Sequence, residues 1–156
     1  MTDIKKDRLR YTKNSSTATQ AYVAIIFNVL YFVSIYHKDV GTYYYSKTIG
    51  FSVVCNLLFL LGSFLCSEGV KNYKLGYCIA FIPLGIFQIV RIFGIPFSAH
   101  NEMLAVNGSM RMVMDDKQFI WVSVCLICSA LACFATGIMG IYKTKMLRDY
   151  EKTLSK

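Results

Sequence analysis

The sequence predicts an all-α integral membrane protein with four transmembrane helices in an up-down bundle. Composition is the first indication, because 55% of the 156 residues are hydrophobic and only 17% are charged. A soluble domain usually carries about a quarter charged residues. Four long apolar runs are the second indication, since a helix of ~20 apolar residues crosses a bilayer. The third is the placement of basic residues around those runs, which predicts how the chain is threaded.

The chain begins with a polar, basic tail, residues 1–19, that we expect to lie in the cytoplasm. The first span covers about residues 20–36 and has Asn28 near its middle. The link that follows, residues 37–45, is too short for a domain and ends in three consecutive tyrosines. Tyrosine is enriched at membrane interfaces, so we expect these side chains to lie at the edge of the bilayer.

The second and third spans are joined by a short basic link. The second span covers about residues 46–66, with Asn56 near its middle, and the link is residues 67–75. The third span covers about residues 76–97 and contains Arg91, the one charged residue in the interior of a long apolar run. A charge in this position carries a large desolvation cost, which makes it the best clue to function.

The longest link, residues 98–117, carries His100 and several methionines. Thioethers and imidazole suit Cu(I), but we favour an interfacial segment whose methionines rest on lipid, and we predict no metal site. Asn107 begins an Asn-Gly-Ser glycosylation acceptor. The fourth span covers about residues 118–142, and the basic tail 143–156 is expected to continue its helix.

The basic residues outside the spans predict the orientation of the chain in the membrane. Each tail has five Lys or Arg residues and the link 67–75 has two, which makes twelve, whereas the other two links have four when Lys47, at the edge of the second span, is counted. Cytoplasmic loops carry the excess of Lys and Arg, so both termini should face the cytoplasm of the cell membrane. We predict no nucleic-acid partner, because these residues lie in short clusters beside apolar runs.

Arg91 should lie ~7 Å from the bilayer midplane, toward the outer side, if the spans are centred on the bilayer. Gln88 precedes it by three residues and therefore shares its helix face. No Asp or Glu lies within any span. The contact to Arg91 must therefore come from neutral groups, water, a lipid phosphate, an anionic ligand or an acidic residue of another subunit.

Polar residues of the other spans lie at a similar depth, which suggests a polar layer across all four helices. Asn28, Asn56 and Ser129 come near the midplane, and Ser52 comes close to the level of Arg91. We predict that the residues for ligand binding or partner contact are Arg91, Gln88, Asn28, Asn56 and Ser52. The alternative is that the amides and hydroxyls only join helices, at about 0.6 kcal/mol each.

Pro83 and Gly85 lie in the middle of the third span and form a predicted hinge. Proline removes a helix hydrogen bond and permits a kink, which frees backbone carbonyls near the bilayer centre. Such breaks occur at the substrate sites of transporters. They are also common in membrane helices without a substrate site, so both interpretations are kept.

The fourth span has small residues at a spacing of four, which predicts close helix packing. These predicted packing residues are Cys125, Ser129, Cys133 and Gly137. They could face the rest of the bundle or a partner chain. Cys125 and Cys128 also form a C-x-x-C spacing used by thiol oxidoreductases, but we interpret them as packing residues.

The sequence contains no phosphate loop, nucleophile constellation or zinc-helix motif, so we predict that the protein is not an enzyme and needs no cofactor. We expect it to act by association, as a subunit or accessory factor of a membrane assembly. Its partners would be membrane lipids and either further copies of itself or another membrane subunit. The alternative is a small transporter or lipid-binding protein that holds an anionic group at Arg91.

Overall fold

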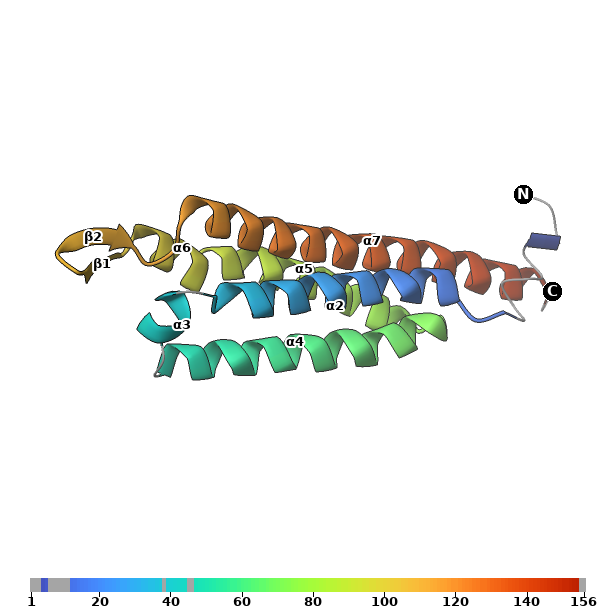
Figure 1. Ribbon diagram of the computed structural model, residues 1–156. Coiled ribbons are helices and arrows are strands. Elements are labelled where there is room, and N and C mark those ends of the chain that lie inside the picture. Colours follow the sequence, from blue (N-terminus) through green and yellow to red (C-terminus); the bar gives the residue numbers. More distant parts are fainter. Residues whose placement is uncertain (1–3, 6–11, 38, 45–46, 155–156) are drawn as a thin grey trace.

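The computed structural model describes residues 4–5, 12–37, 39–44 and 47–154, and it is predominantly helical, as predicted. Figure 1 shows the long helices lying side by side, with a hairpin projecting at one end. The elements are α2 (Ser15–Ile35), α3 (Asp39–Tyr43), α4 (Lys47–Lys71), α5 (Leu75–Ile92), α6 (Ile95–Asn101), β1 (Met103–Val106), β2 (Ser109–Met112) and α7 (Asp116–Leu154).

Four helical segments are long and apolar enough to cross a membrane, which confirms the predicted number of spans. They are Ser15–Ile35, Ile49–Lys71, Leu75–Asn101 and Asp116–Leu154. Large apolar side chains are exposed on all of them, among them Val33, Leu58, Phe93 and Leu131. Apolar surface of this extent is stable in lipid and not in water, so the fold is that of a multi-pass membrane protein.

The helices are longer than the predicted spans at most ends. α2 begins at Ser15, α4 continues to Lys71, and α7 includes most of the basic C-terminal tail. Hydropathy marks only the part of a helix that lies in hydrocarbon. Lys, Arg and Glu are good helix formers, so the helix continues past its apolar segment. The third span ends earlier, because the chain breaks at Gly94 before α6, whose first turn contains Pro96.

A β-hairpin in the longest link was not predicted. Met103 pairs with Met112 and Val106 pairs with Ser109. The turn residues Asn107 and Gly108 have φ values of 50° and 80°. This is the Asn-Gly signature of a two-residue hairpin turn, and it was present in the sequence.

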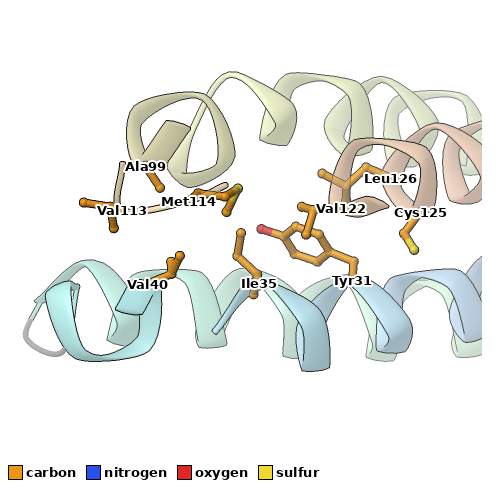
Figure 2. Close-up of a cluster of buried hydrophobic side chains, with 9 residues drawn as sticks. All are labelled: Tyr31, Ile35, Val40, Ala99, Val113, Met114, Val122, Cys125 and Leu126. Atoms are coloured by element: carbon orange, nitrogen blue, oxygen red, sulfur yellow. The ribbon is translucent and has the colours of Figure 1, made fainter. Parts of the chain in front are cut away.

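The methionines of this link divide into two groups. Met103, Met110 and Met112 are exposed on the hairpin, whereas Met114 is fully buried. Figure 2 shows Met114 lying between Ala99 and Ile35. The expectation that the methionines rest on lipid is therefore wrong for Met114, which fills the protein core instead.

The core has two clusters of buried apolar residues, one toward each end of the bundle. The cluster at the hairpin end, drawn in Figure 2, contains Tyr31, Ile35, Val40, Ala99, Val113, Met114, Val122, Cys125 and Leu126. The second cluster contains Ala21, Ala24, Phe59, Val70, Cys78, Phe81 and Cys133. The most extensive helix contacts are those of α7 with α5 and with α2. α7 is therefore the helix on which the bundle is packed.

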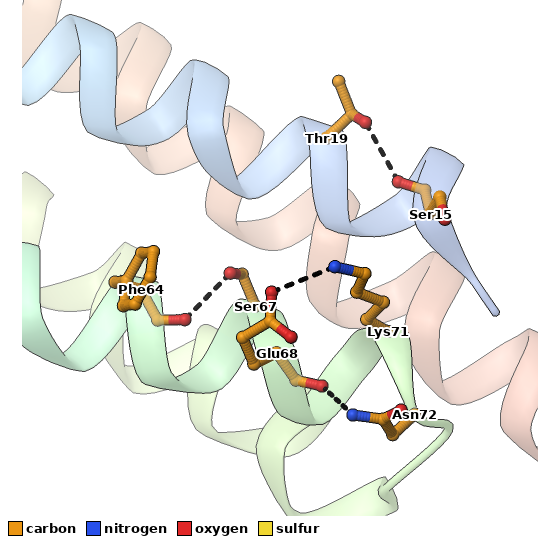
Figure 3. Close-up of polar contacts among 7 residues, drawn as sticks. All are labelled: Ser15, Thr19, Phe64, Ser67, Glu68, Lys71 and Asn72. Atoms are coloured by element: carbon orange, nitrogen blue, oxygen red, sulfur yellow. Dashed lines mark hydrogen bonds and ion pairs between the residues drawn. The ribbon is translucent and has the colours of Figure 1, made fainter.

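At the other end of the bundle, polar residues close the helix termini. Figure 3 shows Ser67 Oγ donating to the Phe64 carbonyl at 2.8 Å and the ion pair of Lys71 with Glu68 at 3.2 Å. The backbone N–H of Asn14 donates to the Lys71 carbonyl at 2.9 Å, and Lys143 Nζ donates to Asn14 Oδ1 at 3.0 Å. These contacts join the start of α2 to the end of α4 and to α7.

Candidate functional site

Arg91 lies in the last turn of α5, and its guanidinium faces the other helices of the bundle. Nη1 donates to Asn28 Oδ1 at 2.8 Å and to Gln88 Oε1 at 2.9 Å. Nη2 donates to Asn56 Oδ1 at 2.7 Å. The ring of Tyr31 lies against the guanidinium, with its centroid 4.5 Å from the central carbon, which is a cation–π distance.

Gln88 extends this set of contacts to α7. Its Nε2 donates to Asn28 Oδ1 and to Ser129 Oγ, both at 3.0 Å. Ser129 Oγ in turn donates to the carbonyl of Ala24 at 2.9 Å. Gln88 and Ser129 are fully buried, so these bonds lie inside the bundle.

The structure thus brings together polar residues of four different helices that the sequence places at a similar depth. We call it the polar layer: Asn28 of α2, Asn56 of α4, Gln88 and Arg91 of α5, and Ser129 of α7. Ser52 participates through its carbonyl, which accepts from Asn56 Nδ2 at 3.0 Å. Ser129 belongs to the polar layer as well as to the packed face on which the sequence placed it.

Arg91 has no anionic partner within hydrogen-bonding distance in the described part of the chain. Its three acceptors are amide oxygens, which carry no net charge. These oxygens orient the guanidinium and replace part of its hydration. They do not neutralise its charge, so the polar layer retains one net positive charge in an apolar surrounding.

A cavity of about 490 Å³ adjoins Arg91. We call it the Arg91 cavity, and it is lined by Tyr31, Tyr44, Phe51, Ser52, Cys55, Phe87, Val90, Arg91, Gly94, Ile95 and Ser98. Phe51 of α4 is 73% exposed and Val90 of α5 is 58% exposed, so the cavity opens to the outside of the bundle between these helices. Its volume lies in the range of small-molecule sites, roughly 300–1,000 Å³.

Tyr44 closes the cavity toward the hairpin end. Its hydroxyl donates to Glu102 Oε2 at 2.7 Å, across a sequence separation of 58 residues. Burial raises the pKa of the Tyr44 hydroxyl, and the hydrogen bond and charge of Glu102 raise it further. The sequence indicated only a tyrosine belt at this position and gave no sign of the Glu102 partner.

The small residues of α7 face α5 of the same chain. A Cβ on Gly137 would lie 3.1 Å from the carbonyl oxygen of Cys78, and one on Gly140 would lie 2.7 Å from the Cys78 sulfur. Cys125 and Cys133 are buried in the two core clusters. These residues therefore pack inside the bundle, and Cys125 and Cys128 are both free thiols.

α5 runs without interruption through Pro83, the predicted hinge. Gly85 has a packing role, because a Cβ at this position would come within 2.8 Å of the Phe134 ring of α7. The helix interruption itself falls later, between Ile92 and Ile95. A hinge motion at Pro83 and Gly85 stays a prediction.

His100, considered above as a copper ligand, packs against the start of α7. Its ring stacks on Phe119 with centroids 4.5 Å apart, and its Nδ1 lies 3.9 Å from Asp116 Oδ1. Within the described ranges, no three His, Cys, Asp or Glu residues come close enough together to hold a metal ion.

Comparisons with known proteins do not extend this description. No protein-family model, curated protein or solved structure matches the chain. The polar layer and the Arg91 cavity are therefore the features of the molecule that bear on its function.

Proposed function

We propose that this chain is a multi-pass protein of the cell membrane that binds the anionic group of a membrane-resident molecule at Arg91. It would serve as a lipid-binding protein or small transporter, the second of the two functions that the sequence suggests. One observation supports this function above all. The positive charge of Arg91 is held by neutral acceptors alone and lies on the wall of an apolar cavity.

Electrostatics favour an anion at this site. Removing a cation from water costs several kcal/mol, and amide oxygens offset only part of that cost. An opposite charge ~4 Å away contributes about 4 kcal/mol at an effective dielectric constant of ~20. A bound anion would thus supply the one interaction that the residues around Arg91 do not.

Hydrocarbon contacts favour a ligand with an apolar body. Phe51, Phe87, Val90 and Ile95 form much of the cavity wall beside Arg91. In a site with one charged group and an otherwise apolar lining, the charged group orients the polar headgroup of a ligand, and the apolar lining contacts the rest of it. An amphipathic molecule meets both requirements.

In this proposal the helices form an up-down bundle with both termini in the cytoplasm. The support is the distribution of Lys and Arg, twelve in the tails and residues 67–75 against four in the other two links with Lys47 counted. A reporter fused after Lys156 should be active only in the cytoplasm. Activity only outside the cell would overturn this orientation.

Binding is tested on the full-length protein, purified and reconstituted in nanodiscs of neutral lipid. We expect a radiolabelled anionic amphiphile, such as a long-chain carboxylate, to bind at least tenfold more weakly to Arg91→Ala, a loss of about 1.4 kcal/mol. Arg111→Ala is the matched control, because it removes the same charge from the exposed hairpin. Equal binding by all three proteins would refute the proposed function.

Association in a membrane assembly is our second proposal, with a homo-oligomer or another membrane subunit as the partner. Its support is the exposed apolar face of α4, which carries Phe51, Leu58, Leu61 and Phe64. In mild detergent, light scattering should then give a mass above that of one chain and its detergent. A strictly monomeric protein that binds the amphiphile as tightly as the reconstituted protein does would exclude this second function.

A further inference from the structure

We infer that the molecule bound at Arg91 is a single-chain amphiphile with one negative charge, which enters the cavity sideways from the bilayer between α4 and α5. This inference rests on the proposed function and narrows it to a ligand class and a route. Four features of the Arg91 cavity carry it: its charge, its free donor, its size and the position of its opening.

The charge of the cavity matches a headgroup with one negative charge. Of the described residues that line it, Arg91 is the only one with a formal charge at neutral pH. One negative charge on the ligand neutralises this site. A second would remain uncompensated in an apolar surrounding, where it is strongly unfavourable. The headgroup is therefore a carboxylate, a sulfonate or a phosphodiester rather than a phosphate monoester with two charges.

The guanidinium has a donor left for such a headgroup. It has five N–H groups, and the hydrogen bonds to Asn28, Gln88 and Asn56 use three of them. Of the remaining two, one interacts with the hydroxyl of Tyr31, which lies beside the guanidinium. The other can donate to an oxygen of a carboxylate or sulfonate headgroup. The side chain of Ser52 also lines the cavity and adds a hydroxyl.

The size of the cavity limits the ligand to one chain. A volume of about 490 Å³ lies in the lower half of the range for small-molecule sites, roughly 300–1,000 Å³. Aromatic and aliphatic side chains from α4 and α5 would contact the hydrocarbon chain. The second chain of a phospholipid would have to remain outside in the bilayer.

The opening of the cavity indicates the route. The exposed residues Phe51 and Val90 lie on the membrane-spanning parts of α4 and α5, so the opening faces lipid. Toward the hairpin end, the hydrogen bond between Tyr44 and Glu102 closes the cavity. Ser98 lines this same end and offers a hydroxyl group to the headgroup, whereas the Tyr44 hydroxyl already donates to Glu102.

The ligand class is tested with four probes that share a hexadecyl chain and differ in the headgroup. They are hexadecanoate, hexadecanesulfonate, hexadecyl phosphate at a pH where it carries two charges, and hexadecyltrimethylammonium. Dissociation constants are measured by native mass spectrometry of the full-length protein from neutral nanodiscs. The carboxylate and the sulfonate should bind at least tenfold more tightly than the other two, and Arg91→Ala should abolish this preference while Arg111→Ala keeps it.

A second variant tests the location without removing Arg91, whose loss could unfold the polar layer. Cys55→Trp places a large side chain in the cavity and removes none of the residues that accept hydrogen bonds from Arg91. It should weaken carboxylate binding at least tenfold, whereas Leu58→Trp, on the exposed face of the same helix, should not. In the unmodified protein, bound hexadecanoate should also slow alkylation of the Cys55 thiol and leave that of Cys66 on α4 unchanged.

The outcomes separate this inference from the proposed function. Arg91-dependent binding of hexadecyl phosphate as tight as that of the carboxylate would overturn the single-charge inference and leave the proposed function standing. If Cys55→Trp binds hexadecanoate as tightly as the unmodified protein, the hydrocarbon chain of the ligand does not lie in the Arg91 cavity. If no anionic probe depends on Arg91, both the inference and the proposed function fail.

Discussion

The two sides of α5 are packed in opposite ways. Toward α7, the α5–α7 interface (Cys78, Phe81, Cys133, Gly137 and Gly140) is so close that an added Cβ would lie 3.1 Å from Cys78 at Gly137 and 2.7 Å from it at Gly140. On the side that faces α4, the C-terminal end of α5 borders the Arg91 cavity of about 490 Å³. Dense packing resists deformation, so we expect α5 and α7 to move as one unit. α4 is then the helix whose displacement would open or close the Arg91 cavity.

The largest expected effect comes from removing an aromatic ring at the α5–α7 interface. Phe81 is fully buried, so Phe81→Ala leaves a cavity and should lower the free energy of unfolding by about 3–5 kcal/mol. Phe51→Ala, at the opening of the Arg91 cavity, should cost less than about 1 kcal/mol because that ring is mostly exposed. Both values can be measured by unfolding in mixed micelles with increasing SDS. Similar losses would mean that the two sides of α5 are packed alike.

Adding volume at the same interface should have the next largest effect. Gly137→Leu forces a side chain against the backbone of Cys78, and we expect a loss of about 1–3 kcal/mol in the same unfolding assay. Gly50→Leu is the control, because nothing lies within 4 Å of a Cβ at that position in α4. If Gly137→Leu were tolerated as well as Gly50→Leu, the helices would not be as close as the structure has them.

The polar layer connects the two sides of α5, and removing one of its acceptors tests that connection. Asn28→Ala deletes the oxygen shared by Arg91 and Gln88 and should destabilise the protein by about 1–2 kcal/mol. Asn101→Ala removes an exposed amide of α6 and should change stability by less than ~0.5 kcal/mol. An Asn28→Ala protein as stable as Asn101→Ala would show that Arg91 does not depend on this acceptor.

The smallest expected effect is at the closure of the Arg91 cavity. Tyr44→Phe removes the hydrogen bond to Glu102 and should cost about 1 kcal/mol at neutral pH. Because the pKa of Tyr44 is raised above its ordinary value of about 10, this contribution is fully present below pH ~10 and is lost as the pH rises through the raised pKa.

The comparison of the unmodified protein with Tyr44→Phe should therefore give a constant difference from pH ~7 to ~9 and a smaller one above pH ~10. Tyr22→Phe, at a partly exposed tyrosine of α2, removes a tyrosine hydroxyl elsewhere in the chain and serves as the control. A difference that grows above pH ~10 would contradict the assigned hydrogen bond.

Much of this structure follows from rules that act along a single helix. Hydropathy and length predicted the four apolar helices, because each must satisfy its own backbone in lipid. The fixed rise per residue placed Asn28, Asn56, Ser129 and Arg91 at similar depths, and the structure joins all four through Gln88 and direct bonds.

The features that escaped prediction depend on relations between distant segments. The Arg91 cavity exists because of the distance between α4 and α5, which no local pattern determines. The partner of Tyr44 is 58 residues away. The hairpin is a different case, since Asn107 and Gly108 did carry a local signal that was interpreted only as a glycosylation acceptor.

The length of α7 has a mechanical consequence. Its 39 residues form one helix of about 58 Å, nearly twice the ~30 Å of the hydrocarbon core. Much of α7 therefore extends beyond the bilayer as a rigid lever with Lys143, Lys145, Arg148 and Lys152 along it. Ser129, about a third of the way along α7 from Asp116, ties this helix to the polar layer. If α7 tilts together with α5, the end at Leu154 moves farther than the residues beside Ser129.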